Sequence, residues 1–313
     1  MTTQFAVESW DPSYGTPSAL NELTESVDQV DLDIEVEVDK WAPVNVGEPQ
    51  KPETVVFIDG VRRFDAHLWV GNGLEAKQGI CATVAAGAVR CTDTEAKVEV
   101  IQIERALHTS ADVTAPVELP NVSERYTIKP TKDDTPESLN FSVHNHMARV
   151  EDAVSEAFTD EALVVYDGPL NQRETPAAVG YVKTQHVQYL EGNALTALAQ
   201  LEPGERTPVF LVGNRFERYS WFMRLQNPIG PARSGIVRLE LPQTYSKDIK
   251  EVIERADFVT AVMPTYASAP HREARAPQNL YPIAGLERQM RWRLGDRDIL
   301  ERGLRLASLV GQS

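Results

Sequence analysis

The sequence of 313 residues predicts an α/β protein built on a mixed sheet flanked by helices, with an acidic N-terminal segment in front. Two apolar runs, VVFIDG at 55–60 and LVVYDG at 163–168, are too short for helices, and their Val, Ile, Phe and Tyr residues favour strands buried on both faces. Between them, apolar residues spaced by three or four from Leu139 to Phe158 predict one helical stripe. Strands and helices that alternate in this way are typical of the α/β class.

The composition is that of a soluble globular protein, with 42% hydrophobic and 25% charged residues. No run approaches the roughly 18 apolar residues of a membrane span, and no basic and then apolar leader begins the chain. We therefore expect a cytoplasmic protein without a membrane partner. Cys81 and Cys91 have no Cys or His pattern around them, which predicts reduced core residues rather than a disulfide or a zinc site.

The charge is distributed unevenly. Residues 1–50 contain eleven acids and one base, and residues 51–313 contain 35 acids and 30 bases, so the segment carries −10 of the net −15. Its run DLDIEVEVD suits a solvent-facing strand or an extended arm. We expect two regions, an acidic N-terminal segment (1–50) and one larger domain (51–313).

Arginines cluster in two parts of the chain. Residues 205–238 contain six Arg and two Glu, and residues 271–305 contain eight Arg and five acids. Such patches can hold phosphates even when the net charge is negative. A solvated surface with scattered arginines is the equally simple alternative.

The first half of the domain predicts an antiparallel meander. Its strands are expected at 54–59, continuing toward the Asn72-Gly73 turn, at 79–90 and at 97–107, because Asn-Gly between apolar runs is a hairpin signal. Residues 108–134 are expected to form a loop.

Helices and strands alternate in the second half. Thr135-Pro136 supplies a cap and a first-turn proline for the helix that carries the apolar stripe. The later elements are expected as a strand at 162–167, a helix near 188–201, and strands at 207–212 and in the run GIVRLEL. Three antiparallel strands followed by helix, strand, helix and strand is the order of a ribonuclease H-like core.

In such a core the first and fourth strands are neighbours, which would bring Asp59 and Asp167 together at their strand ends. Two carboxylates about 4 Å apart repel by roughly 4 kcal/mol at an effective dielectric of 20, and a divalent cation removes that cost. Mg²⁺ and Mn²⁺ prefer carboxylate oxygens, and a pair of such ions can promote phosphodiester hydrolysis. The alternative is that each Asp-Gly pair only makes a turn.

A third carboxylate is expected from the intervening helix. Glu151 falls just beyond the edge of the apolar stripe, whereas Glu156 points to the opposite face. His144 and His146 project about 200° apart on the helix and cannot share an ion. Lys183 is a further candidate in GYVKTQH, together with the nearby His186, although a surface position is the simpler explanation for either.

The joint order of several short runs resembles the NurA nuclease family over roughly residues 54–305. These runs are VVFIDG, VYDGPL, VGYVK, ERTPVFLVG, YSWFMRL, GIVRLELP and RAPQNLYPIAGLERQMRWRLGD. The resemblance implies a ribonuclease H-like, Mn²⁺-dependent (or Mg²⁺-dependent) nuclease that acts on DNA ends. It also implies a homodimer coupled to a HerA-type hexameric ATPase that translocates DNA.

Carried over by position, the two strand aspartates of the family fall on Asp59 and Asp167, and the helical glutamate falls on Glu151. Family members often place a metal-binding His in a helix after Tyr-Pro, but the helix after Tyr281-Pro282 offers Glu287 instead. Either Glu287 substitutes, His271 reaches in from the preceding loop, or the site is weaker.

Three functions therefore compete. The first is a metal-dependent DNA nuclease in which Asp59, Glu151 and Asp167 hold the ions and Lys183 steadies the scissile phosphate or a product oxyanion. The second is a catalytically weak DNA-binding or assembly partner of a translocase, which the missing His favours. The third is an actin-like ATPase, which also uses Asp-Gly strand ends but would need a second glycine-rich phosphate loop.

Overall fold

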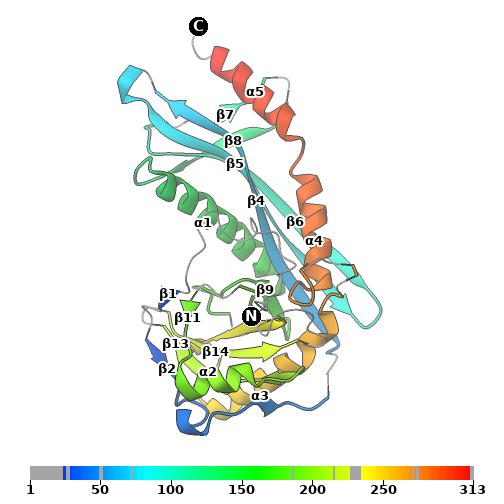
Figure 1. The fold of residues 1–313 in the computed structure, drawn as a ribbon. Coiled ribbons are helices and arrows are strands. Elements are labelled where there is room, and N and C mark those ends of the chain that lie inside the picture. Colours follow the sequence, from blue (N-terminus) through cyan, green and yellow to red (C-terminus); the bar gives the residue numbers. More distant parts are fainter. Residues whose placement is uncertain are drawn as a thin grey trace, which may run out of the picture. The chain divides into compact units, whose positions relative to one another are not determined.

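The computed structural model describes residues 24–25, 29–48 and 52–310, apart from positions 72, 114, 121, 172, 176, 185–186, 214–215, 226–233, 270 and 273–274. The chain forms two compact units. Unit 1 comprises the described residues of Met1–Phe57, Arg90–Ala96 and Phe158–Ala284, and unit 2 those of Ile58–Val89, Lys97–Ala157 and Gly285–Ser313. The division passes through the strands β4, β5 and β6 and the helix α4, which Figure 1 labels.

Unit 1 contains a mixed sheet. Strand β9 is parallel to β10, and the pairs β10–β15, β15–β14 and β14–β13 are antiparallel. Its strands are β2 (Val30–Asp31), β3 (Val44–Asn45), β9 (Val164–Asp167), β10 (Ala178–Val182), β12 (Glu205–Arg206), β13 (Phe210–Val212), β14 (Arg218–Arg224) and β15 (Ile236–Pro242). Strands β1 (Thr24–Glu25) and β11 (Val187–Gln188) pair separately.

Helices cover both faces of this sheet. Phe222 on β14 packs in one apolar cluster with α2 (Gly192–Ala199), and the adjacent Trp221 donates its indole N–H to Thr260 of α3 (Ile249–Val262) at 2.9 Å. Because successive strand residues point to opposite faces, α2 and α3 lie on opposite sides of the sheet.

Unit 2 is built on long strands. The long strands are β4 (Thr54–Val70), which begins in unit 1, β5 (Lys77–Thr92), which ends in unit 1, and β6 (Ala96–Thr109), whose first residue lies in unit 1. Two shorter strands, β7 (Val117–Glu118) and β8 (Arg125–Pro130), accompany them. Its helices are α1 (Pro136–Ser155), α4 (Tyr281–Arg293), which also begins in unit 1, and α5 (Arg297–Val310). Leu286 of α4 packs on β5 at Gly87, where an added Cβ would lie 3.0 Å from its Cδ1.

Helix α1 follows its predicted signals. The Thr135 side chain accepts the Ser138 N–H, and Pro136 opens the first turn. Leu139, Val143, Val150 and Val154 of the predicted stripe are buried. The stripe therefore packs inward, as the spacing requires.

The predicted fold class is confirmed: the protein is a mixed α/β structure with a large mixed sheet and flanking helices. The strand order β10–β9–β4–β5–β6 places the fourth predicted strand beside the first. Strands β4, β5 and β6 are joined by short connections, and this makes them antiparallel neighbours because parallel strands need longer crossovers.

Some elements differ from the prediction. The segment 108–134, expected to be a loop, contains β7 and β8, and β8 pairs in parallel with β6. Strands β10 and β14 lie in the runs VGYVK and YSWFMRL, to which no secondary structure was assigned. Only partners distant in sequence reveal these short strands, because a run of five to seven apolar residues has no distinctive period.

The described part of the acidic N-terminal segment packs within unit 1. Strand β2 pairs with β13, and β3 pairs with β12. The Glu35 carboxylate accepts hydrogen bonds from Arg206 Nη1 at 2.8 Å and from the Val209 N–H at 2.6 Å, and Arg206 is fully buried. Trp41 joins the α2 cluster. Residues 29–48 are thus part of the core of unit 1 and not a free arm.

Cys81 and Cys91 are buried and free, in agreement with their predicted role as reduced core residues. Among the helices of the described residues, none is long and apolar enough to cross a membrane.

Candidate metal centre

Asp59 and Asp167 come from neighbouring strands of the sheet. Asp59 is buried and lies inside β4 rather than at its end, because the strand continues to Val70. Its Oδ1 accepts the Gly60 N–H at 2.7 Å. Asp167 is the last residue of β9, and the start of β4 is held beside this strand by the Val56 N–H, which donates to Leu163 O at 3.0 Å. The expectation of two strand ends is therefore wrong for Asp59.

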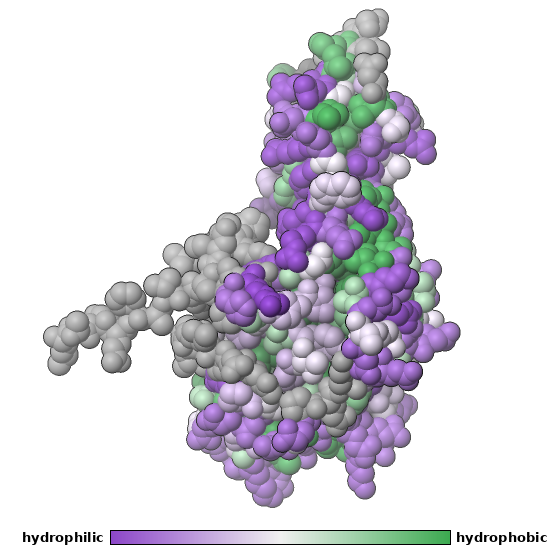
Figure 2. Space-filling view, turned by 90° about the vertical axis from the view of Figure 1, so that its right-hand side faces the viewer, coloured by the Kyte–Doolittle hydropathy of each residue, from purple (hydrophilic) through white to green (hydrophobic). Residues whose placement is uncertain are grey.

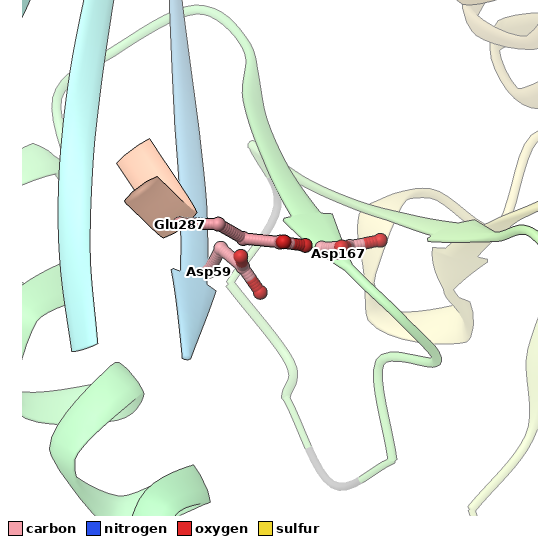
Figure 3. Close-up of side chains that lie close together, drawn as sticks. All are labelled: Asp59, Asp167 and Glu287. Atoms are coloured by element: carbon pink, nitrogen blue, oxygen red, sulfur yellow. The ribbon is translucent and has the colours of Figure 1, made fainter. Parts of the chain in front are cut away.

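Glu287 joins the two aspartates. One carboxylate oxygen from each of Asp59, Asp167 and Glu287 lies within 4.8 Å of the others, and Asp59 and Glu287 are buried. Figure 3 shows the Glu287 side chain extending from α4 toward Asp59 and Asp167. We call these three residues the carboxylate cluster.

A buried lysine lies against the cluster. Lys183, the residue after β10, donates from Nζ to Asp167 Oδ2 at 2.6 Å and to Asn279 Oδ1 at 2.7 Å. Asn279 is fully buried and was missed by the sequence analysis, although it stands in the run RAPQNLYP. Burial, and then the charge of Asp167, raises the pKa of Tyr181 well above its ordinary value, so its hydroxyl remains a donor to Gln278 O at 2.7 Å.

Glu151 lies beside the cluster but is not part of it. Its buried side chain covers the backbone next to Asp59, since a Cβ on Gly60 would lie 2.2 Å from Glu151 Oε1. The third carboxylate that meets the aspartates is Glu287. The helical period predicts that Glu151 lies at the edge of the buried face, but it does not specify which strand residue its side chain contacts.

The candidate histidines lie elsewhere. His271 is exposed and accepts a hydrogen bond from Arg272 at 3.1 Å, and it is not among the cluster's ligand atoms. His186 falls outside the described residues. His144 is exposed and His146 is buried, in agreement with their predicted projection from opposite sides of α1.

A second buried carboxylate holds the chain that follows Asp167. Glu240 on β15 accepts the Leu170 N–H at 2.9 Å and the Arg218 Nε–H at 2.8 Å, and it also pairs with Arg238. Burial alone would raise the pKa of Glu240, but the charges of Arg238 and Arg218 and the Leu170 N–H lower it overall. Glu240 is thus an ionised anchor for the loop after β9.

The donor set of the cluster suits a hard divalent cation. Three carboxylate oxygens within 4.8 Å repel one another, and burial strengthens that repulsion. Lys183 offsets part of it at Asp167. Mg²⁺ and Mn²⁺ are bound through carboxylate oxygens, so Asp59, Asp167 and Glu287 fit such an ion.

No protein-family model and no curated protein matches this chain. Among solved structures, the NurA nuclease from Sulfolobus solfataricus is similar with a TM-score of 0.49 and 10% identity, over 81% of this chain and 82% of that one. The catalytic domain of human endonuclease V is similar with a TM-score of 0.35 and 14% identity, over 78% and 84%. At these values neither likeness assigns a family or an activity to this chain.

Proposed function

We propose that this chain is a divalent-metal-dependent nuclease that hydrolyses phosphodiester bonds in DNA. The observation that carries the proposal is the carboxylate cluster, in which oxygens of Asp59, Asp167 and Glu287 lie within 4.8 Å of one another. Like charges at that distance need a cation, and oxygen-only donor sets are typical of Mg²⁺ and Mn²⁺. A bound ion would supply charge stabilisation to the phosphate and to an attacking water.

The neighbouring residues have separate roles in this proposal. Lys183 brings a buried positive charge to Asp167, where it steadies the scissile phosphate or a product oxyanion, and Asn279 holds the lysine in place. Glu151 packs against Gly60, beside Asp59, and is proposed as the carboxylate that supports a second ion. His271 is exposed and not among the cluster's ligand atoms, and the proposal gives it no role.

The finer assignments rest on the sequence resemblance. They are a preference for Mn²⁺, assembly as a homodimer, and the processing of DNA ends in double-strand break repair together with a HerA-type hexameric ATPase. Sedimentation at micromolar concentration tests the dimer, and co-purification with a hexameric translocase tests the partnership.

Incubation of the purified protein with end-labelled DNA in Mn²⁺, Mg²⁺ or EDTA tests the activity. Asp59→Asn and Asp167→Asn keep the side-chain shape and remove a charge, so each should lower cleavage by about 100-fold or more. Glu156→Gln is the matched control, because Glu156 is an exposed glutamate next to α1, and it should cleave like wild type. Near wild-type rates in both Asn variants contradict the proposal.

One observation favours a second function, that of a DNA-binding or assembly partner with weak catalysis. Asp167 already forms an ion pair with Lys183 at 2.6 Å, and a paired carboxylate binds a metal ion less tightly. DNA binding in EDTA with no cleavage in any divalent metal would support this alternative. Lys183→Met should then leave DNA binding unchanged, whereas in the nuclease it should abolish turnover.

A further inference from the structure

Helix α4 carries Glu287 and also presents an unusual solvent face. Leu286, Met290 and Leu294 are buried on its inner side. Arg288, Arg291 and Trp292 are exposed, and Trp292 shows 82% of its surface. The side of the molecule that bears α4 and α5 faces the reader in Figure 2, where hydrophilic residues (purple) surround smaller groups of hydrophobic ones (green).

The helical period relates this face to the carboxylate cluster. Arg291 follows Glu287 by four residues, so it lies about 40° around the axis and about 6 Å along it. Arg288 and Trp292 form the next row, about 100° and 140° from Glu287. We call Arg288, Arg291 and Trp292 the α4 track, since they lead away from Glu287 along one side of the helix. Arg293 falls outside it, about 120° from Glu287 in the other direction.

A purely structural role does not explain the track. Last-turn arginines often cap the carbonyls of a helix C-terminus. Here that work is done by Arg63, which donates to Gly295 O at 2.7 Å and Leu294 O at 3.3 Å, and by Arg105, which donates to Leu294 O at 3.1 Å. Within the described part of the chain, Arg288 and Arg291 have no hydrogen-bonded or ion-paired partner.

The chemistry of the track matches unpaired nucleic acid. Guanidinium groups contact phosphates, and an exposed indole offers a stacking platform for a base. A base inside a duplex is already stacked on both faces, whereas the bases of an unpaired strand can turn a face to Trp292. Arg105 adds positive charge at the end of the helix, whereas the charge of Arg63 there is offset by Asp65. The one acid inside this stretch of α4, Glu287, points inward.

We propose that the α4 track binds the single-stranded part of a DNA substrate, with one base stacked on Trp292 and the adjoining phosphates held by Arg288 and Arg291. The inference rests on the proposed nuclease function for the identity of the substrate. It adds a substrate class to that function, namely a single strand or the frayed end of a duplex.

The test measures binding in EDTA of a fluorescent oligodeoxythymidine about 12 nucleotides long. Trp292→Ala should weaken binding by roughly tenfold, the scale of one lost base stack. The matched control is Trp69→Ala, which removes another tryptophan of unit 2 with 69% of its surface exposed and should bind like wild type. On an oligonucleotide of the same length with abasic sites, Trp292→Ala and wild type should bind equally.

Salt dependence tests the arginines. Arg288→Gln and Arg291→Gln should each reduce the slope of log affinity against log salt by about 0.7, the value for one phosphate contact on a single strand. Arg293→Gln, on the other side of the helix, should change the slope by less.

Two results would overturn the inference. One is equal binding of the thymidine oligonucleotide by wild type and Trp292→Ala. The other is a change in oligomeric state of Trp292→Ala on sedimentation, which would make the track a protein interface. Cleavage by wild type in Mn²⁺ is measured in parallel. If binding does not depend on the α4 track but the protein cleaves DNA, the inference is wrong and the nuclease proposal is retained. If binding depends on the track but no cleavage occurs, the nuclease proposal is wrong and the inference is retained.

Discussion

The two Asp-Gly pairs of this protein share a dipeptide but need their glycines for different reasons. Gly60 lies inside β4 and is crowded, since a Cβ there would lie 2.2 Å from Glu151 Oε1 and 2.9 Å from Met147 Cγ. Gly168 follows the last residue of β9 with φ +124°, and nothing lies within 4 Å of an added Cβ. One glycine makes room for a neighbouring side chain, and the other lets the backbone leave the strand.

The difference shows how each aspartate is presented. At Asp59 the strand continues and a helix closes over it, so the carboxylate is positioned by packing between α1 and β4. At Asp167 the chain turns away, and the following loop is held by Glu240 through the Leu170 N–H. The same dipeptide therefore positions its aspartate in two ways. Side-chain packing positions Asp59, and the backbone conformation after β9 positions Asp167.

A third aspartate, Asp65, differs from both, because its carboxylate is held by protein donors alone. Asp65 lies on β4 six residues after Asp59 and is fully buried, but donors surround it: Arg63 at 2.7 Å, Thr83 at 2.5 Å and Tyr126 at 3.0 Å. Asp65→Asn should lower the free energy of unfolding by about 3–5 kcal/mol, because it leaves Arg63 without its counter-charge.

Urea denaturation in metal-free buffer measures this effect, and Asp59→Asn is its control. That variant relieves repulsion within the carboxylate cluster and should not lower stability. A loss of stability in Asp59→Asn equal to that in Asp65→Asn would mean that both carboxylates are structural.

Crowding at Gly60 can be tested through its neighbour. Gly60→Ala should destabilise by about 2–3 kcal/mol, because the methyl group overlaps Glu151. In a Glu151→Ala background most of this cost should disappear, which a double-mutant cycle by urea denaturation would detect. Gly168→Ala is the control: its cost, about 1 kcal/mol from backbone strain, should be the same in both backgrounds. If Gly60→Ala and Gly168→Ala show the same coupling energy with Glu151→Ala, crowding by Glu151 is not specific to Gly60.

Acid pH should lower the stability of the protein through the contacts between α1 and β6. Helix α1 is tied to β6 by His108 Nδ1, 2.8 Å from Ser142 Oγ, and by His146 Nε2, 2.9 Å from Glu104 Oε2. Burial, and then the charges of His146 and Lys129, lowers the pKa of His108 to about 3. Below its ordinary pKa the unfolded chain gains a proton that the folded chain does not bind, so stability falls as the pH drops from about 6.5 toward 3.

For His108 alone the loss between pH 7 and pH 5 should be about 2 kcal/mol. His108→Gln should remove that part of the pH slope, whatever its effect on stability at pH 7. Urea midpoints at several pH values measure the slope, and identical slopes for variant and wild type would contradict the assignment.

Much of the fold follows from local sequence patterns. The apolar stripe and the Thr135-Pro136 signal located α1, since a helical period and a cap are properties of neighbouring residues. Strands β4, β5, β6, β9 and β15 lie where the sequence predicts strands. The order of these elements was enough to predict that Asp59 and Asp167 would be near one another, because few topologies accommodate it.

Contacts between distant segments decided the rest. Glu287, and not Glu151, meets the two aspartates, and Asn279, 96 residues from Lys183, holds that lysine. Residues 29–48 joined unit 1 because Glu35 pairs with the buried Arg206, 171 residues away. A hydrophobic period shows which face of an element is buried, and a cap shows where a helix begins, but neither identifies the side chain that a residue contacts on another element. That choice is made only when the elements pack and every buried charge must find a partner.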